Sequence, residues 1–518
     1  MRLDLDNLPA DTSLLQQLVR DLADVVERQK TELAELEQLK LLLRQMKRAM
    51  FGRRSERLDP DQMQLALEDI EADIARVEEK IAPVVSEPAA EPEAPARRRD
   101  PPDHLPHRDL TIEPADIGQD RATCPCCGGA LHAAGETVSK MLDYVPAQIR
   151  VLCVRRPKYA CRGCGTLHQA PAPEKAIAKG MATPALLAHV IVSRYADHVP
   201  FYRQAQILAR HGVEIDRSVL AGWAGQACWW LEMLHGELAK DVFASTKLFA
   251  DDTPMPTLNP GAGRVRIGRF WAYARDDRPW LGPDPPAVVY FYTPDRKGER
   301  PASHLTGFRG VLQVDGYAGF ERLTAERRVV LAACWAHARR RFYDLSEAGS
   351  PIATEALRRI GQLYALEERI RGRTADKRRQ ERQTHGMPLV ADLKTWFEQE
   401  LRRVPSRSKL AEAIRYALGR WEALCVYLDD GRVEMDTNTV ERTIRPIALN
   451  RKNALFAGSE GGGRRWAIIS SLLETAKLND VEPYAYISDV LERMVNGHPA
   501  NRIADLLPWN WKPADIKS

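Results

Sequence analysis

The sequence predicts a multidomain α+β protein, and three observations lead to this prediction. First, 518 residues are too many for one hydrophobic core, because single cores stop growing near about 250–300 residues. Second, apolar residues near the N-terminus follow heptad steps, and a segment rich in Pro, Ala and Glu separates them from the rest of the chain. Third, strand-like apolar runs and long amphipathic helical stretches follow each other after that segment.

Residues 1–82 are predicted to form a helical region with a coiled-coil seam. The apolar side chains recur in two rows, Leu15, Leu22, Leu36, Leu43 and Met50, and Leu18, Val25, Leu39 and Met46. Such a seam favours self-association, here as a homodimer, although one long helix packed on its own domain has the same pattern. Residues 83–102 carry no apolar periodicity, and their proline content predicts a semi-extended linker.

Residues 103–172 carry two CxxC pairs, Cys124 with Cys127 and Cys161 with Cys164, each beside the glycines of a tight turn. Four thiolates suit a closed tetrahedral site, so the pairs predict one structural Zn²⁺. The intervening residues 137–159 alternate in a β-like manner, which predicts a zinc ribbon. Cys126 has the wrong spacing for a ligand, and Cys153 falls within the strand-like run, so neither is expected to bind the ion.

Residues 173–240 are predicted to be helical and include a stretch with helix-turn-helix proportions. Gly212 is expected to end the first helix of the pair, and Asp216 to cap the second, whose first turn offers Arg217 and Ser218. DNA contact through Arg217 and a purely structural helix pair both fit this pattern.

Acidic residues follow two strand-like runs and open one helix. Asp251 and Asp252 follow KLFA, Asp315 follows GVLQV, and Glu441 lies in a predicted helix that starts at Asp436 or Thr437. Each acid alone is more often a solvated charge or a helix cap. Together on rigid elements they are the hard oxygen ligands that Mg²⁺ prefers, with positions left for phosphate and water.

The motifs resemble those of a known family over most of the chain. They are FGRRSE at residue 51, CPCCGG, RPKYACRGCG, YADHVPFYRQ, DDTP, VDGYAGF, CWAHARRRF and NTVERTIRPIALNRKNALFAGSEGGG. In these motifs the chain is similar to transposases of the insertion sequence sixty-six family. The resemblance implies an RNase-H-like catalytic core of the DDE type over 241–480, with a helical insertion over about 345–430 and a C-terminal tail over 481–518. It implies Asp251, Asp315 and Glu441 as the catalytic acids. Many relatives have Glu at the position of Asp252, so we expect Asp252 only to support the site.

The expected activity is DNA transposition. Two Mg²⁺ or Mn²⁺ ions held by the acids would activate first water and then the freed 3′-hydroxyl at the element end for in-line attack on phosphate. DNA, as element terminal repeats and target, is the expected partner, and small accessory proteins accompany many relatives. Cations near the acids are expected to hold phosphates: His337, Arg339, Arg340, Arg341, Arg442, Arg445, Arg451 and Lys452. A further basic run in the insertion fits either a solvated face or a DNA-tracking surface: Arg371, Arg373, Lys377, Arg378 and Arg379.

The targeting signals and the net charge of the sequence bear on the location and function of the protein. We expect a cytoplasmic, nucleoid-associated protein that does not enter a membrane, since the sequence shows no secretory signal and no long apolar run. A net charge of +4 neither demands nor excludes nucleic acid. One alternative is a catalytically inactive, transposase-derived DNA-binding or architectural protein, and another is a repair or restriction nuclease.

Overall fold

The structure is a computed structural model that describes residues 148–160, 162, 167–259, 264–324 and 328–513. The chain divides into two compact units, Met1–Leu152 and Cys153–Ser518, and the helices and strands with described bounds belong to the second. The predicted coiled coil, the linker and the four cysteines of the CxxC pairs lie outside the described residues. In the part of the chain that the structure describes, no helix is long and apolar enough to cross a membrane.

A small hairpin flanks the second CxxC pair in sequence. Strands β1 (Lys158–Ala160) and β2 (Leu167–Gln169) pair antiparallel. Residues 148–157, where the strand-like run containing Cys153 was expected, form no strand. Val151 and Leu152 are 88% and 71% exposed, so the alternating pattern has no surface to bury against, and alternation alone does not stabilise a strand.

Among the described residues, three helices precede the large sheet, and their boundaries follow local signals. Helix α3 (Pro184–Tyr195) begins after Thr183, whose side chain accepts a hydrogen bond from the backbone N–H of Leu186. Helix α4 (Phe201–Arg210) ends before Gly212, which has a φ of +76°. Helix α5 (Arg217–Phe243) begins after Asp216, which accepts a hydrogen bond of 2.7 Å from Ser218 N–H. The predicted end of the first helix and the predicted cap of the second are confirmed.

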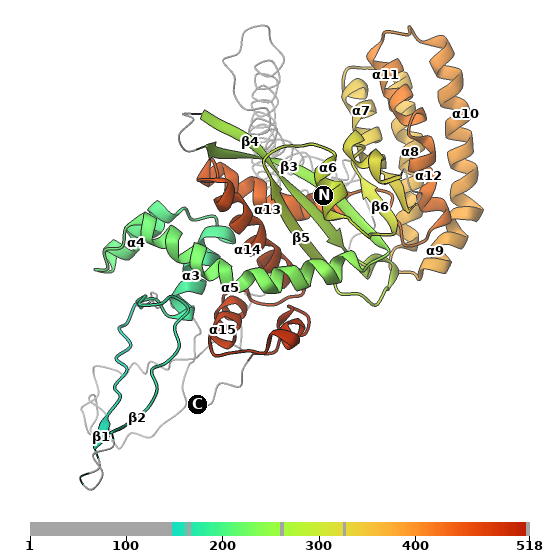
Figure 1. Ribbon diagram of the computed structural model, residues 1–518. Coiled ribbons are helices and arrows are strands. Elements are labelled where there is room, and N and C mark those ends of the chain that lie inside the picture. The colour runs from blue at the N-terminus through green and yellow to red at the C-terminus, as the bar shows by residue number, and fades with distance from the viewer. Residues whose placement is uncertain (1–147, 161, 163–166, 260–263, 325–327, 514–518) are drawn as a thin grey trace, which may run out of the picture. The chain divides into compact units, whose positions relative to one another are not determined.

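A five-stranded mixed sheet forms the centre of the second unit, in the order β5-β4-β3-β6-β7 (Figure 1). β3 pairs antiparallel with β4, which pairs antiparallel with β5, while β6 and β7 run parallel to β3. The strands are β3 (Lys247–Asn259), β4 (Arg264–Arg275), β5 (Ala287–Thr293), β6 (Gly310–Val314) and β7 (Val329–Ala333). Short helices connect them: η1 (Arg278–Trp280), α6 (Glu299–His304) and η2 (Ala318–Thr324). The sheet and its many helices bear out the predicted mixture of α and β structure.

Strand β3 continues for eight residues beyond Asp251, whereas the sequence predicted that Asp251 and Asp252 end the strand. The two prolines Pro254 and Pro256 argue against a strand, but they lie where β3 has β4 on one side only, because pairing with β6 stops at Ala250. On the opposite edge the N–H of Leu258 donates to Ala457 O, so the even-numbered residues direct their nitrogens away from β4. Neither proline therefore removes a hydrogen bond of the β3–β4 ladder.

Helix α14 (Glu460–Leu478) covers the open edge of β5. Ser471 Oγ accepts a hydrogen bond of 2.8 Å from the N–H of Tyr290. Thr475 Oγ1 accepts one from the N–H of Val288 and donates one to its carbonyl. Buried backbone groups need partners, and these hydroxyl groups provide them where a sixth strand would otherwise have to pair.

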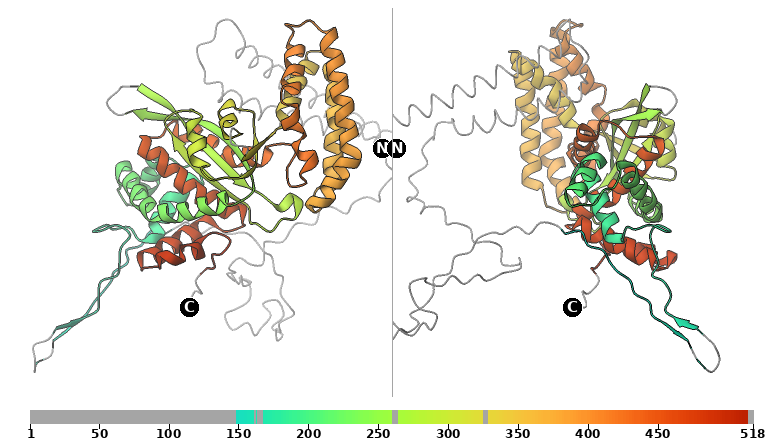
Figure 2. Two further views of the ribbon diagram at one scale, coloured as in Figure 1. Left: turned by 45° about the vertical axis from the view of Figure 1, so that its right-hand side comes forward. Right: turned by 90° about the vertical axis from the view of Figure 1, so that its left-hand side faces the viewer.

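A helical insertion separates β7 from the helix that carries Glu441. It comprises α7 (Trp335–Glu347), α8 (Pro351–Ile370), α9 (Ala375–Glu381), η3 (Arg382–Gly386), α10 (Met387–Arg403), α11 (Lys409–Leu418) and α12 (Trp421–Asp429). Helices α8 to α12 stand together beside the β7 side of the sheet (Figure 2). Their core is aromatic: Phe342 stacks on Phe397 with ring centres 5.2 Å apart, and Trp335 meets Trp421 edge to face.

The basic run in this insertion corrects one expectation. Arg378 is 1% exposed and pairs with Glu434 at 2.8 Å and with Glu367 at 3.4 Å. Arg382, which follows the run, is fully buried and pairs with Glu367 at 2.6 Å. Arg378 therefore belongs neither to a solvated face nor to a DNA-tracking surface, because carboxylates inside the insertion hold its charge.

The remaining helices, which follow the insertion, pack against the helices that precede the sheet. Helix α13 (Asn438–Ala454) follows the insertion, and α15 (Pro483–Val495) and η4 (Ala500–Leu506) lie in the segment expected as a C-terminal tail. Helix α15 packs against α3, with Tyr486 and Ile487 fully buried. A buried hydrogen bond of 2.5 Å from Arg194 in α3 to Asn450 in α13 connects the helical segment to the helix that carries Glu441.

Candidate active site

Strand register brings the first two acids together. β3 and β6 run parallel, and the last paired residues are Ala250 and Val314. Asp251 directly follows Ala250 in β3, and Asp315 directly follows Val314 at the end of β6. The two acids therefore lie side by side where β6 ends. The N–H of Asp252 donates to Asp251 Oδ1 at 2.7 Å, and the N–H of Tyr317 donates to Asp315 Oδ1 at 3.0 Å. Both carboxylates are thus oriented by local backbone groups.

Glu441 lies in the first turn of α13, which begins after Thr437 as the sequence predicted. The hydroxyl of Thr437, 1% exposed, donates to Glu441 Oε1 at 3.0 Å. The side chain of Glu441 is 41% exposed. Helix α13 therefore presents this carboxylate to solvent while Thr437 holds one of its oxygens.

Gln313, which sequence reasoning missed, fixes the start of α13 against β6. It is fully buried, its amide donates to the carbonyl of Glu434 at 2.8 Å, and its carbonyl accepts from the N–H of Glu434 at 2.9 Å. This paired contact connects the residue two before Asp315 to the segment that leads into Glu441. A polar side chain inside the apolar run GVLQV is the signal by which it could have been found.

Acidic groups surround the buried carboxyl of Asp251. Burial, together with repulsion from Asp315, Asp252 and Glu441, raises its pKa to about 8, although the hydrogen bond from the N–H of Asp252 acts in the opposite direction. The main charged groups that shift the pKa of Asp251 are thus carboxylates. A buried carboxylate surrounded by others is stable in its ionised form only when a cation compensates it.

Asp252 points to the opposite face of β3 and has the opposite surroundings. Its side chain is fully buried and forms ion pairs with Arg296 at 2.8 Å and with Arg269 at 3.2 Å. Burial raises the pKa of Asp252, and the two guanidinium groups oppose this shift in part. The adjacent acids thus separate into one paired with cations and one that faces other acids.

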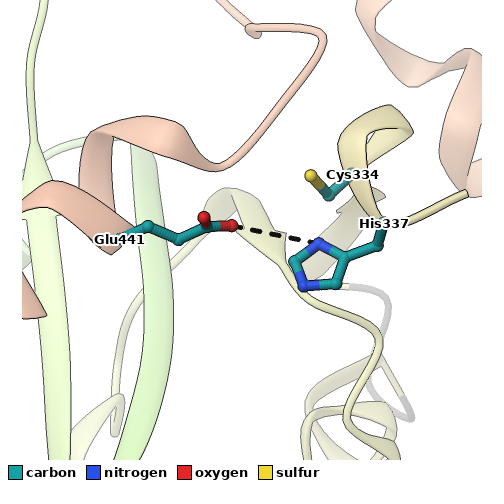
Figure 3. Close-up of side chains that lie close together, drawn as sticks. All are labelled: Cys334, His337 and Glu441. Atoms are coloured by element: carbon teal, nitrogen blue, oxygen red, sulfur yellow. Dashed lines mark ion pairs between the residues drawn. The ribbon is translucent and has the colours of Figure 1, made fainter. Parts of the chain in front are cut away.

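His337 and Cys334 lie beside Glu441 (Figure 3). His337 Nδ1 is 3.9 Å from Glu441 Oε1, and one ligand atom of each residue lies within 4.8 Å of the others. The buried thiol of Cys334 accepts a hydrogen bond of 3.3 Å from Thr437 N–H, and burial raises its pKa to about 11. Cys334 is thus a neutral thiol at the junction of α7 and α13, and His337 lies beside the partly exposed carboxylate of Glu441.

The predicted cations divide into separate groups. Arg339, Arg340, Arg442 and Arg445 are exposed, and Arg445 and Lys452 share the face of α13 that carries Glu441. Arg442 lines a cavity of about 250 Å³ together with Arg278 and Glu474. Arg451 instead binds β3, donating to Thr253 Oγ1 and to the carbonyl of Pro254. Arg217 begins α5, which packs on β5.

Four family profiles match the chain in sequence order. The profile described as Transposase IS66 family matches residues 179–465, and the IS66 C-terminal element matches 471–509. The zinc-finger binding domain of transposase IS66 matches 121–165, a range that includes both CxxC pairs. Transposase C of IS166 homeodomain matches 38–110. The chain belongs to the IS66 transposase family, whose members act on DNA.

Relatives with the same extent occur in one bacterium. The chain is 41% identical to the uncharacterized protein y4jD of Sinorhizobium fredii, and the match covers 100% of this chain and 99% of the relative. It is 42% identical to the uncharacterized protein y4qI of the same organism, over 92% of this chain and 89% of the relative. The similarity to y4jD therefore extends over the whole sequence, including residues that the structure does not describe.

Proposed function

We propose that this chain is a DNA transposase that cleaves the ends of a mobile element and joins the freed 3′-hydroxyls to target DNA. Asp251, Asp315 and Glu441 are its catalytic acids in this proposal, within an RNase-H-like core made of the mixed sheet and α13. The single observation that carries the proposal is the burial of the Asp251 carboxyl among other acids, beside Asp315, at neighbouring positions of two parallel strands.

The donor set fits Mg²⁺ or Mn²⁺. Three carboxylates supply hard oxygen ligands, and a divalent cation would stabilise the ionised form of Asp251, which burial and the neighbouring acids disfavour. When bound, a pair of such ions lowers the pKa of an attacking water or hydroxyl and stabilises charge on the phosphate and the leaving oxygen. Asp251, Asp315 and Glu441 would hold them.

The residues around the acids position these ligands. The N–H groups of Asp252 and Tyr317 and the hydroxyl of Thr437 each hold one carboxylate oxygen, which leaves the second oxygen of each acid for a ligand. Such hydrogen bonds reduce the reorganisation needed when substrate and cations arrive.

Positively charged side chains would hold the DNA strand near these acids. We assign this role to His337, Arg339, Arg340, Arg341, Arg445 and Lys452, with Arg442 on the neighbouring face of α13. Arg451 would act through β3, which it binds. We assign Arg217 to DNA contact at the start of α5, in the manner of a helix-turn-helix pair.

The N-terminal regions complete the proposal. Cys124, Cys127, Cys161 and Cys164 would hold one structural Zn²⁺, in agreement with the zinc-finger profile over 121–165. Residues 1–82 would pair two copies of the chain, so that two active sites act on two element ends, with accessory proteins as further partners. We expect about one zinc per purified chain by metal analysis, and loss of zinc in Cys161→Ser; a zinc-free wild-type chain would remove this assignment.

A strand-joining assay tests the catalytic assignment. Purified chain, Mg²⁺, plasmid target and a labelled element end with a free 3′-hydroxyl should give joined product with wild type, and none with Asp251→Asn or Glu441→Gln. Glu355→Gln is the matched control, because Glu355 pairs only with arginines on α8. Equal joining by Asp251→Asn would overturn the assignment of the acids. DNA binding without joining by any variant, wild type included, would favour the inactive DNA-binding alternative.

A further inference from the structure

Two arginines enclose one tyrosine beside the second acid. The guanidinium carbon of Arg341, from α7, lies 3.9 Å from the ring centre of Tyr416 in α11, and that of Arg420 lies 4.2 Å from the same centre. Both guanidinium groups therefore lie against the same aromatic ring. Arg341 was expected among the phosphate-binding residues, whereas Tyr416 and Arg420 gave no signal in the sequence.

This stack contacts the backbone that follows β6. The hydroxyl of Tyr416 lies 3.5 Å from the carbonyl of Asp315, and Arg420 Nη2 lies 3.5 Å from the carbonyl of Gly316. Gly316 has a φ of +93°, and a Cβ there would lie 3.0 Å from Arg420 Nε. The close approach of Arg420 to the residue after Asp315 therefore requires glycine.

The positive charge of the stack has no acidic partner. Among the described residues, no carboxylate lies within ion-pair distance of Arg341 or Arg420, in contrast to the paired Arg378 and Arg382 of the same insertion. Arg341 is exposed and Arg420 half-buried. Stacking on the ring holds both guanidinium groups in place without neutralising them, which prepares them for an anion from outside.

A cavity lies beside the stack. Its volume is about 680 Å³, and Arg420, Gly316, Tyr317, Trp421, Leu331 and Lys394 are among the residues that line it. This volume is in the range of small-ligand sites, and the lining combines apolar side chains with two cations, Arg420 and Lys394, and two carboxylates, Glu321 and Glu422. A base would lie against the apolar wall, and its phosphate would lie toward Arg420 and away from the two carboxylates.

We propose that Arg341 and Arg420, held by Tyr416, bind the phosphodiester backbone of the DNA strand that passes Asp315, with an adjacent nucleotide in the cavity. The site rests on the proposed function, since it places the strand next to an acid assigned to catalysis. Arginine presents a planar fork to phosphate oxygens, and phosphate contacts set the register of a strand without reading its sequence. The site therefore determines which phosphate reaches the acids.

The test is the salt dependence of binding to a labelled element-end duplex, with the full chain and without Mg²⁺. The slope of log K against log salt is negative, and each lost phosphate contact reduces its magnitude by about 0.9. Arg341→Gln and Arg420→Gln should therefore each make the slope less steep by about that amount and weaken binding about 5- to 10-fold at 0.1 M salt. The lysine variants Arg341→Lys and Arg420→Lys should keep the wild-type slope. Arg415→Gln is the matched control, because it removes one positive charge next to Tyr416 in α11, where Arg415 hydrogen-bonds the carbonyl of Ser406.

The outcomes separate this site from the catalytic proposal. The site is supported if the lysine variants keep the wild-type slope and the glutamine variants have a less steep one. This holds even if the variants melt at a lower temperature than wild type. Unchanged slopes in both glutamine variants, or an equal reduction in Arg415→Gln, would overturn it. If wild type joins no strand while the arginine variants lose slope, the catalytic proposal fails and the phosphate site stands. If wild type joins strands and the slopes do not change, the phosphate site alone fails.

Discussion

Binding of Mg²⁺ to this site should release a proton from Asp251. With a pKa of about 8, the carboxyl is protonated in about nine of ten metal-free molecules at pH 7. A cation binds the ionised form, so binding at pH 7 should release about 0.9 proton per chain, and at pH 9 only about 0.1. Below pH 8, the apparent Mg²⁺ affinity should therefore increase about tenfold for each unit by which the pH increases. Above pH 8 it should become constant.

Isothermal titration in two buffers of different ionisation enthalpy measures the released protons directly, with zinc-loaded chain throughout. Asp251→Asn should release none at pH 7. Asp295→Asn is the matched control, because Arg300 holds the pKa of Asp295 near 2, so this acid is ionised throughout and its loss should leave the release unchanged. Release below about 0.2 proton by wild type at pH 7, or undiminished release by Asp251→Asn, would refute the reasoning.

The same carboxyl has a defined effect on stability without metal. An unfolded aspartate has a pKa of about 3.9, so between about pH 4 and 8 the folded chain binds more protons at this position. The contribution of Asp251 to the free energy of unfolding therefore falls as the pH rises through this window, by up to about 1.4 kcal/mol per unit, and excess Mg²⁺ should remove the dependence.

Three further perturbations test other parts of the fold. Burial lowers the pKa of His235 to about 4. Below pH 6.5 the unfolded chain therefore binds a proton at this position that the folded chain does not, and the free energy of unfolding should fall by roughly 3 kcal/mol toward pH 4. Thermal melts of His235→Gln should show a smaller loss of stability in acid. Gln313→Leu leaves buried groups of Glu434 without partners and should cost roughly 2–4 kcal/mol in urea unfolding and lower the rate of joining. Asp252→Ala removes the ion pair to Arg296 and should cost about 2–3 kcal/mol while proton release on Mg²⁺ binding persists.

Each of these has a contradicting result. Acid sensitivity of His235→Gln equal to wild type would show that other groups dominate it. Unchanged unfolding of Gln313→Leu would show that the start of α13 is held elsewhere. Loss of Mg²⁺ binding in Asp252→Ala without loss of stability would assign Asp252 to the metal site.

Local signals made part of this fold predictable. Gly212 and Asp216 mark a helix end and a helix start that depend on single-residue conformation and a side-chain cap, and both lie where the sequence predicts. Glu441 in the first turn of a helix and Asp315 directly after a strand are local in the same sense. Residues close in the chain decide these features, so a single sequence contains the information.

Long-range pairing made the rest unpredictable. Asp251 and Asp252 are equivalent in sequence, and only the β3 register and the positions of Arg269 and Arg296 assign them different surroundings. Arg378 lies in a run of basic residues that resembles a solvated surface, yet Glu434 binds it inside the protein. These partners lie far apart in the sequence, so no local sequence pattern identifies them.

The parallel pairing of Ala250 with Val314 determines which acid of β3 lies beside Asp315. Because side chains alternate between faces, deleting one residue within β3 ahead of Asp251 would put Asp252 beside Asp315, and inserting one would put Ala250 there. Inherited variation in these two strands should therefore consist of substitutions, whereas changes of length should collect in the connections between strands, where a shift of one position alters no pairing.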